Sequence, residues 1–297
     1  LMPSVPGEKL VVEDLSGIEY LTNLKELSLI GTRKPEDSKL LKELSNLEKL
    51  QLKVPLEFDL EFLNELNYLE ELRIDTTESV KAIGQLTNIK KLSISTEAYD
   101  LSPLSNLKNL TELSIEKCNT EKKEVFKFLR ELKALKKLKL NIEASDLIKQ
   151  EASISYIKEM DNLEELELNL GISEGTEDLS YLMDYTNLTK LSIHTSGKIS
   201  PIEGIDHLES LKELKLDGGG IVLKDTASLG ELIHLEKLDM FIDEEENIDF
   251  LKNMTKLKEL YILKISEKAM SLKPLENLKN LKTLKISAGY RYDTAND

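Results

Sequence analysis

Residues whose side chains could do chemistry are few and scattered in this chain. The three histidines, His194, His207 and His234, lie in different segments. No cysteine or carboxylate stands near them at the spacing of a zinc site or a Ser-His-Asp triad. The histidines therefore do not indicate metal or nucleophilic catalysis, and we interpret them as surface residues.

Two loops contain residues that could hold a ligand. The run 217–220, Asp-Gly-Gly-Gly, is rich in glycine, but it lacks the Lys-Ser/Thr pair of a phosphate-binding loop and the Rossmann glycine spacing. The acidic run 243–246 with Asp249 offers oxygen ligands for calcium, yet it lacks the glycine and terminal glutamate of an EF-hand loop. We interpret these as a turn and a solvated connection, and we expect no catalytic residue, metal ion or cofactor.

The chain has a single cysteine, Cys118, which excludes an internal disulfide. Free cysteine commonly behaves as a small apolar side chain. We therefore expect Cys118 to be a buried packing residue. Its presence is compatible with a reducing compartment and with a bacterial surface.

The charge balance of the chain is acidic. Among 297 residues, 55 Asp and Glu stand against 40 Lys and Arg, a formal net charge of −15. This charge repels phosphate backbones, so we expect no nucleic-acid partner. No run approaches the roughly 18 apolar residues of a membrane span, and residues 1–7 do not resemble a natural start. We expect a fragment without its targeting sequence and without a transmembrane segment.

A recurring phrase positions all of these residues. Its clearest copy is LSNLKNLTELSI, in which Leu107, Leu110, Leu113 and Ile115 are the apolar positions. We name each copy by the leucine in the middle of its strand, the index leucine. Twelve copies are spaced 20 to 28 residues apart, as solenoid repeats are. The index leucines are Leu27, Leu50, Leu72, Leu92, Leu113, Leu138, Leu166, Leu191, Leu214, Leu238, Leu260 and Leu284.

The repeat predicts an α/β solenoid. The index leucine and the apolar residue two positions later alternate with period two, which predicts a short strand with both side chains inward. The segments between strands have helical spacing, as at Val125, Phe128, Leu129 and Leu132. This order predicts a curved horseshoe with a parallel sheet on its concave face and short helices on its convex face. We expect a cap over residues 1–20, an array of about 12 repeats over 21–289 and a polar tail over 290–297.

The chain resembles the leucine-rich repeat superfamily, and within it the short-repeat type of bacterial internalins. The resemblance covers about residues 10–289 and is carried by the N-L-x-x-L phrases. It implies a leucine-rich repeat solenoid whose concave face binds a protein or peptide. The phrases begin at Asn23, Asn46, Asn88, Asn109, Asn162, Asn187 and Asn280.

One column of the repeat departs from that family. The family usually places asparagine three residues after the second strand leucine, where the side chains form a ladder with neighbouring backbone. We expect no asparagine ladder here, because the column holds other residues. They are Thr32, Pro55, Thr77, Glu97, Cys118, Glu143, Gly171, Ser196, Gly219, Asp243, Ile265 and Gly289.

Three columns of side chains point outward from the predicted sheet. The first column, directly before each index leucine, alternates in charge through eleven repeats. Parallel strands lie about 4.8 Å apart, so we expect a structural charge ladder that maintains register, with about a few tenths of a kcal/mol from each exposed pair. A charged partner surface is the alternative. The ladder comprises Glu26, Lys49, Glu71, Lys91, Glu112, Lys137, Glu165, Lys190, Glu213, Lys237 and Glu259.

The second column directly follows each index leucine, and the third lies two residues further on. Most of these residues are small or polar, but Phe241, Tyr261 and Leu263 come from adjacent repeats and are apolar. Aromatic clusters on a polar face are common anchors of protein interfaces. We predict a partner-binding patch here, or a patch covered by the tail 290–297 as a cap. The predicted rim consists of Asp217, Asp239, Lys215 and Lys264.

The sequence favours a non-enzymatic protein-recognition module. The internalin resemblance implies a bacterial cell-surface or secreted protein, and a cytoplasmic location remains open. One alternative is an intracellular regulatory subunit that holds an enzyme in its curve. Another is the recognition domain of an effector whose enzymatic part lies outside this sequence.

Overall fold

The computed structural model of the chain contains two compact units. Unit 1 comprises residues 1–119 and 124–134, and unit 2 comprises residues 120–123 and 135–297. Residues 1–13 of the expected cap and the whole tail 290–297 lie outside the described residues, so those boundaries stay predictions. The structure describes residues 14–30, 35–53, 58–75, 79–118, 124–142, 155–171, 179–195, 203–218, 221, 226–242, 247–264 and 270–288.

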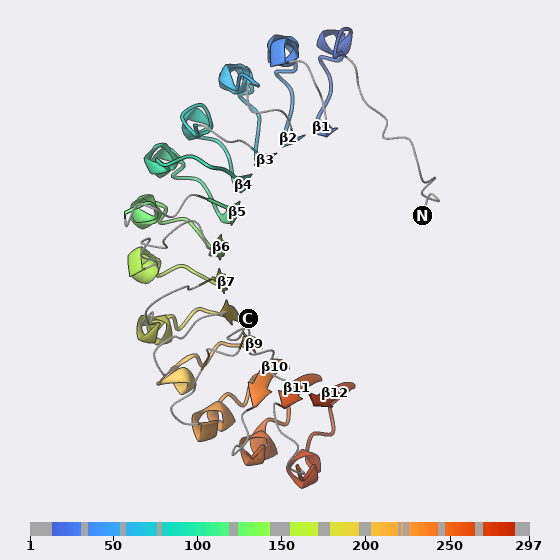
Figure 1. The fold of residues 1–297 in the computed structure, drawn as a ribbon, viewed down its shortest axis with the longest axis vertical. Helices are drawn as coiled ribbons and strands as arrows, with labels where there is room; N and C mark the ends of the chain where they lie inside the picture. The colour runs from blue at the N-terminus through green and yellow to red at the C-terminus, as the bar shows by residue number, and fades with distance from the viewer. Residues whose placement is uncertain are drawn as a thin grey trace, which may run out of the picture. The chain divides into compact units, whose positions relative to one another are not determined.

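In unit 1, short strands alternate with 3-10 helices along the described chain (Figure 1). The strands are parallel and pair in sequence order, and they lie on the concave side with the helices on the convex side. The strands are β1 (Glu26–Ile30), β2 (Lys49–Lys53), β3 (Glu71–Asp75), β4 (Lys91–Ser95) and β5 (Glu112–Lys117). The helices are η1 (Ile18–Tyr20), η2 (Pro35–Glu43), η3 (Glu61–Glu65), η4 (Ile83–Gln85), η5 (Ser102–Asn106) and η6 (Lys127–Glu131).

Unit 2 repeats this arrangement, again with parallel strands that pair in sequence order. Its strands are β6 (Lys137–Ile142), β7 (Glu165–Leu170), β8 (Lys190–Thr195), β9 (Glu213–Asp217), β10 (Lys237–Ile242), β11 (Glu259–Lys264) and β12 (Thr283–Ala288). Its helices are η7 (Ser155–Glu159), η8 (Ser180–Asp184), η9 (Ile205–His207), η10 (Thr226–Glu231), η11 (Asp249–Asn253) and η12 (Lys273–Leu275).

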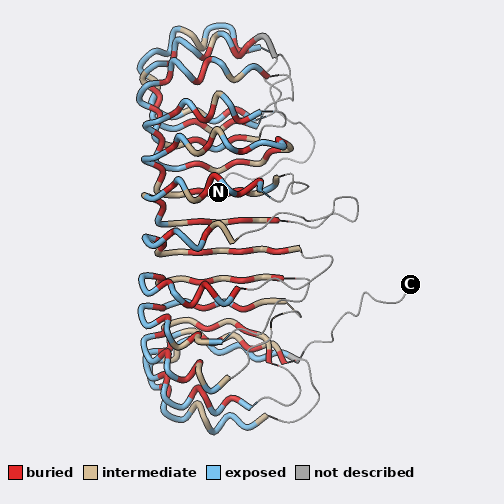
Figure 2. Tube along the Cα trace, turned by 90° about the vertical axis from the view of Figure 1, so that its left-hand side faces the viewer, coloured by how far each residue is buried: buried red, intermediate tan, exposed pale blue. Residues whose placement is uncertain are grey.

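The strand register follows the index leucines within each unit. Leu27 pairs with Leu50 and Leu50 with Leu72 in unit 1, and Leu238 pairs with Leu260 in unit 2. From β2 to β11, buried apolar residues alternate with exposed or half-exposed residues along each strand (Figure 2). A slip by one residue would turn every leucine of a strand toward solvent. The predicted repeats and their inward leucines are therefore confirmed.

The helices of the described residues are of the 3-10 type, because the leucine spacing in the repeat is three. The backbone N–H of Leu104 donates to Leu101, that of Leu107 to Leu104 and that of Leu110 to Leu107. A turn of three residues places side chains three apart on the same side. All four leucines consequently point into the core, where each is 0% exposed. An α-helix, with 3.6 residues per turn, would rotate them progressively away.

An asparagine ladder runs along the repeats, at a different column from the one that the family pattern indicates. It uses the asparagine four residues before the index leucine, whose amide donates to a carbonyl of the preceding repeat's turn. The family's column itself holds no asparagine, so the sequence analysis considered the wrong column and did not predict this ladder. Described examples are Asn46 to Thr22 at 2.9 Å, Asn88 to Asn67 at 3.1 Å, Asn109 to Thr87 at 2.9 Å, Asn187 to Asp161 at 3.2 Å and Asn280 to Thr255 at 2.8 Å.

Gly218 lets two neighbouring repeats approach closely at the end of β9. Its φ of +108° lies in the left-handed region, and a Cβ there would stand 2.0 Å from the carbonyl oxygen of Thr195. Packing therefore requires a glycine at 218, the first glycine of the run 217–220, which agrees with the predicted turn. Gly219 and Gly220 lie outside the described residues.

Cys118 lies just after β5 and is half-buried. Burial raises the pKa of its thiol to about 12, and the negative charge of Glu97 acts in the same direction. This environment favours the neutral thiol, but the side chain is half-buried and not buried as the sequence predicted.

The asparagine ladder gives a first prediction. Asn109→Ala removes the bond to Thr87, so we expect the free energy of unfolding to fall by about 0.5–1.5 kcal/mol. Urea titration followed by circular dichroism measures this change. Asn106→Ala, on the exposed side of η5, is the matched control and should change stability by less than about 0.5 kcal/mol. Equal losses in both variants would mean that the ladder does not stabilise the fold.

Gly218 gives a second prediction. We expect Gly218→Ala to destabilise unit 2 by about 1–2 kcal/mol for the backbone conformation and about 1–3 kcal/mol more for the clash. Gly17→Ala is the control, because Gly17 has a φ of +100° and nothing within 4 Å of its missing Cβ. Urea midpoints should therefore fall much further for Gly218→Ala than for Gly17→Ala. Equal shifts would mean that the approach to Thr195 does not matter.

Cys118 gives a third prediction. The thiolate is the nucleophile, so at pH 8 alkylation by iodoacetamide should be at least about a hundredfold slower in the folded chain than in urea. The raised pKa also means that the folded state favours the neutral thiol. The stability that Cys118 contributes should therefore be lost as the pH rises from 9.0, the ordinary pKa, toward about 12, the pKa in the folded chain. Mass spectrometry of timed samples measures the rate. Similar rates in both states would contradict the raised pKa.

Candidate partner-binding surface

The first outward column forms ion pairs between neighbouring strands. In each described pair, the lysine of one strand reaches the glutamate of the next strand along the chain. The pairs in unit 1 are Lys49–Glu71 at 3.7 Å and Lys91–Glu112 at 3.0 Å. Those in unit 2 are Lys137–Glu165 at 2.7 Å, Lys190–Glu213 at 3.8 Å and Lys237–Glu259 at 3.2 Å. The role of this ladder in maintaining register stays a prediction.

Another column of ion pairs is present that the sequence analysis did not predict. It lies two residues before each index leucine, where the strand begins. The pairs are Lys25–Glu48 at 2.8 Å, Glu70–Lys90 at 2.6 Å, Lys136–Glu164 at 2.7 Å and Glu236–Lys258 at 2.5 Å. The same alignment of repeats would have found these opposite charges, because they too occupy one column in adjacent repeats.

The predicted apolar residues lie side by side in unit 2. Phe241 pairs with Leu263 across β10 and β11, and Tyr261 stands two residues before Leu263 on the same face. All three side chains are half-exposed. The structure thus brings together the three residues that the sequence proposed, which we call the patch.

Tyr261 is held in place by charged neighbours. Its ring lies between two lysines, with Lys237 Nζ at 5.7 Å and Lys285 Nζ at 5.3 Å from the ring centroid. Its hydroxyl donates to Glu259 at 3.2 Å. Partial desolvation and the charge of Glu259 raise the pKa of Tyr261, and the hydrogen bond to Lys237 lowers the pKa of Glu259. The ring is therefore oriented before any partner arrives.

A network of charged side chains lies beside the patch on β8, β9 and β10. Lys215 lies between two carboxylates, 3.6 Å from Asp217 and 3.8 Å from Asp239. His194 Nδ1 is 3.2 Å from the Asp217 carboxylate. Asp239 pairs with Tyr261 in the strand register, so the network adjoins the patch directly. Three of the four predicted rim residues are therefore neighbours on the outward face.

Lys264 is not part of the rim. Its side chain is only 6% exposed, because β11 continues to this residue and the strand alternation turns it inward. Ile242, at the same position on β10, is likewise buried. Lys264 faces inward because β11 is six residues long, so its last residue keeps the alternation of the strand.

The other candidates for chemistry stay apart. His207 lies in η9, and His234 lies after η10 with its Nδ1 2.8 Å from Lys256 Nζ. The acidic run 243–246 is outside the described residues, and Asp249 is the first residue of η11. Within the described part of the chain, no group of three or more His, Cys, Asp or Glu could hold a metal ion. No described helix is long and apolar enough to cross a membrane.

The chain is similar to known proteins in its three-dimensional structure. No protein-family model and no curated protein sequence matches the chain. An internalin of Listeria monocytogenes matches with a TM-score of 0.66 and 23% identity, covering 96% of this chain and 85% of that protein. A leucine-rich repeat protein of Leptospira interrogans matches with a TM-score of 0.66 and 22% identity, covering 94% and 76%. A TDR receptor matches with a TM-score of 0.59 and 14% identity, covering 91% and 49%.

These matches agree with the geometry of the repeats. In both units the index leucines stack in register, parallel strands line the concave side and short helices cover the convex side. The chain therefore has the leucine-rich repeat fold, which it shares with the internalin and the other structures.

Proposed function

We propose that this chain is a non-enzymatic protein-recognition module and that the patch is part of its binding surface. The observation that carries the proposal is the half-exposed cluster of Phe241, Tyr261 and Leu263 on paired strands of unit 2. Extended strand surfaces of solenoids commonly bind other proteins. A partner protein that binds over the cluster would remove its apolar surface from water, which is favourable.

The patch has the properties of an interface anchor. Tyrosine buries a large area and has few rotatable bonds, so it loses little entropy when a partner orders it. The two lysines beside Tyr261 already restrict its ring. The adjacent charges of Lys215, Asp217 and Asp239 lie at the rim, where they favour a partner with complementary charges.

The compartment is a further part of this proposal. We place the chain in a bacterial cell-surface or secreted protein, because one of the matching structures is an internalin and another comes from Leptospira interrogans. Sequencing of the gene on both sides of this region tests the placement. A secretion signal or wall anchor supports it, and their absence from the complete gene favours an intracellular regulatory subunit.

The patch gives a fourth prediction. The double variant Phe241→Ser, Tyr261→Ser should capture a partner from host or bacterial lysate at least about tenfold less than the wild type, because an anchor residue contributes about 2 kcal/mol or more. Affinity capture with quantitative mass spectrometry measures the loss. Ile30→Ser is the matched control, since Ile30 lies in the same column as Phe241 in unit 1 and is 60% exposed.

Thermal unfolding of the same variants separates binding from folding. If the double variant loses cooperative unfolding, the patch is structural and acts as part of a cap. If the folded variant captures the same proteins as the wild type, the patch is not the binding surface.

A further inference from the structure

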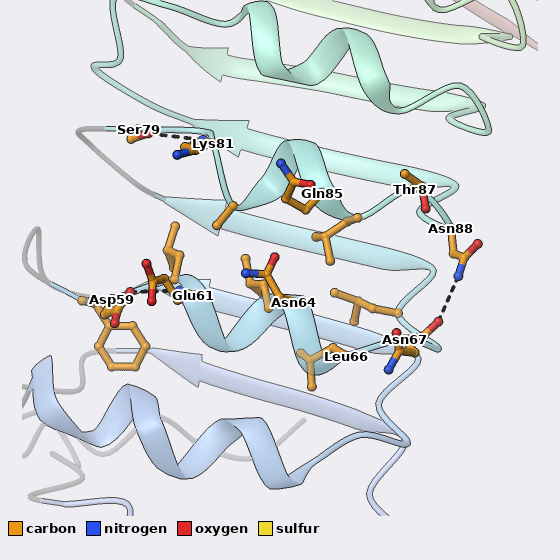
Figure 3. Close-up of a pocket in the computed structure, with 16 residues that line it drawn as sticks. Asp59, Glu61, Asn64, Leu66, Asn67, Ser79, Lys81, Gln85, Thr87 and Asn88 are labelled. Atoms are coloured by element: carbon orange, nitrogen blue, oxygen red, sulfur yellow. Dashed lines mark hydrogen bonds between the residues drawn. The ribbon is translucent and has the colours of Figure 1, made fainter.

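A groove of about 850 Å³ lies on the helix side of unit 1, between η3 and η4 (Figure 3). It is on the opposite side of the sheet from the outward columns. Leu63, Leu66 and Leu69 lie at its base but are 0–2% exposed, so its open apolar floor comes mainly from half-buried Leu60 and Ala82. Its volume falls within the range of about 300–1,000 Å³ that is common for ligand sites.

Gly84 explains why the helices separate at this point. A Cβ on Gly84 would stand 2.5 Å from the carbonyl oxygen of Pro103, so the backbone of η4 approaches η5 as only glycine allows. The repeat that contains η4 is also the shortest, with 20 residues between Leu72 and Leu92. A short helix drawn toward η5 leaves space on its other side, toward η3.

The walls of the groove carry carboxamides. Asn64 of η3 and Gln85 of η4 lie on opposite walls (Figure 3), and neither amide has a hydrogen-bond partner among the described residues. At one end, the Asn88 amide donates to the Asn67 carbonyl at 3.1 Å. A carboxamide can both donate and accept, as the N–H and C=O of a peptide backbone require.

The other end of the groove carries charge. Asp59 and Glu61 are both exposed there, and no described cation forms an ion pair with either of them. One oxygen of Asp59 accepts the backbone N–H of Glu61 at 2.9 Å, which leaves its second oxygen available. Lys81 lies across the groove, so this end has two carboxylates and one ammonium. Together with the net charge of −15, this end favours a basic side chain.

The aromatic residue of the groove argues against a sugar as the ligand. Phe58 is only 5% exposed, and its ring packs edge-to-face on Phe62 at 6.2 Å between centroids. It therefore offers little open ring face for a sugar to stack on. The amides and the apolar floor fit an extended peptide better, because its backbone can bond to the walls while alternate side chains face the floor.

We infer that the groove between η3 and η4 binds an extended peptide segment that carries a lysine or arginine, with the basic side chain seated against Asp59 and Glu61. This site is on a different unit from the patch, and its existence does not depend on the proposed function of the patch.

Selection from a phage-displayed random heptapeptide library on the full chain tests this inference. We expect enriched peptides with a basic residue at a constant position among alternating apolar residues. Asn64→Trp fills the groove and should lose these peptides, whereas Asn106→Trp, on the exposed side of η5, should retain them. If enrichment on the wild type does not exceed that on Asn64→Trp, the inference is overturned.

The charge of the site is tested with the double variant Asp59→Asn, Glu61→Gln, in which asparagine keeps the bond from the Glu61 backbone. Fluorescence anisotropy with an enriched peptide and its Lys→Gln analogue gives the affinities. We expect the wild type to prefer the basic peptide by about 3–10-fold and the variant to show no preference. An unchanged preference in the variant places the basic residue elsewhere and overturns the assignment.

Two controls distinguish peptide binding in the groove from binding at the patch and from sugar binding. The Phe241→Ser, Tyr261→Ser variant should select the same peptides, so failure of the patch and failure of the groove are distinguishable. Binding of a neutral oligosaccharide array by the wild type, lost in Asn64→Trp, would assign the groove to sugars instead. Circular dichroism and thermal unfolding of each variant confirm that it is folded.

Discussion

The stacking of identical leucine positions in register is the constraint on which this structure depends. A single repeat has one strand and one short helix and cannot cover its own leucines, so each repeat needs neighbours. Leu104, Leu107 and Leu110 are 0% exposed because repeats on both sides cover them. The last described strand shows the contrary case, since Leu284 is 43% and Ile286 38% exposed. Burial in this fold thus comes from the neighbouring repeat rather than from within the repeat.

The register that buries the leucines also aligns the polar groups. Equivalent residues of adjacent repeats are paired across neighbouring strands. Asparagines, lysines and glutamates therefore form columns whose members are one strand apart. The amide of Asn109 reaches the backbone of the preceding repeat, and Lys91 reaches the glutamate of the next. Each exposed contact is weak, but all of them require the same register. The predicted role of the columns is therefore to oppose a slip by a whole repeat, which would bring like charges together but leave the leucines buried.

The same stacking carries both proposed binding surfaces, the patch on the strand side and the groove on the helix side. On the strand side of unit 2, outward residues such as Tyr261 are held by neighbours one strand away. On the helix side of unit 1, the distance between neighbouring helices depends on the length and sequence of the segment between the strands. Where Gly84 draws η4 toward η5, a groove opens toward η3. Variation within a repeat can therefore create a site without disturbing the core.

The sequence by itself determined the repeats, the parallel strands, the inward leucines and the neighbours in each column. These properties depend on spacing along the chain. Because the strands pair in register, residues at equivalent positions of adjacent repeats become neighbours in the structure. Phe241, Tyr261 and Leu263 could be placed together for this reason. The asparagine ladder and the second ion-pair column were also present in the sequence, but they lie outside the columns that the strand pattern emphasises. Only the tertiary structure decided the burial of Lys264 and the groove at Gly84, because these depend on where a strand ends and how closely two helices pack.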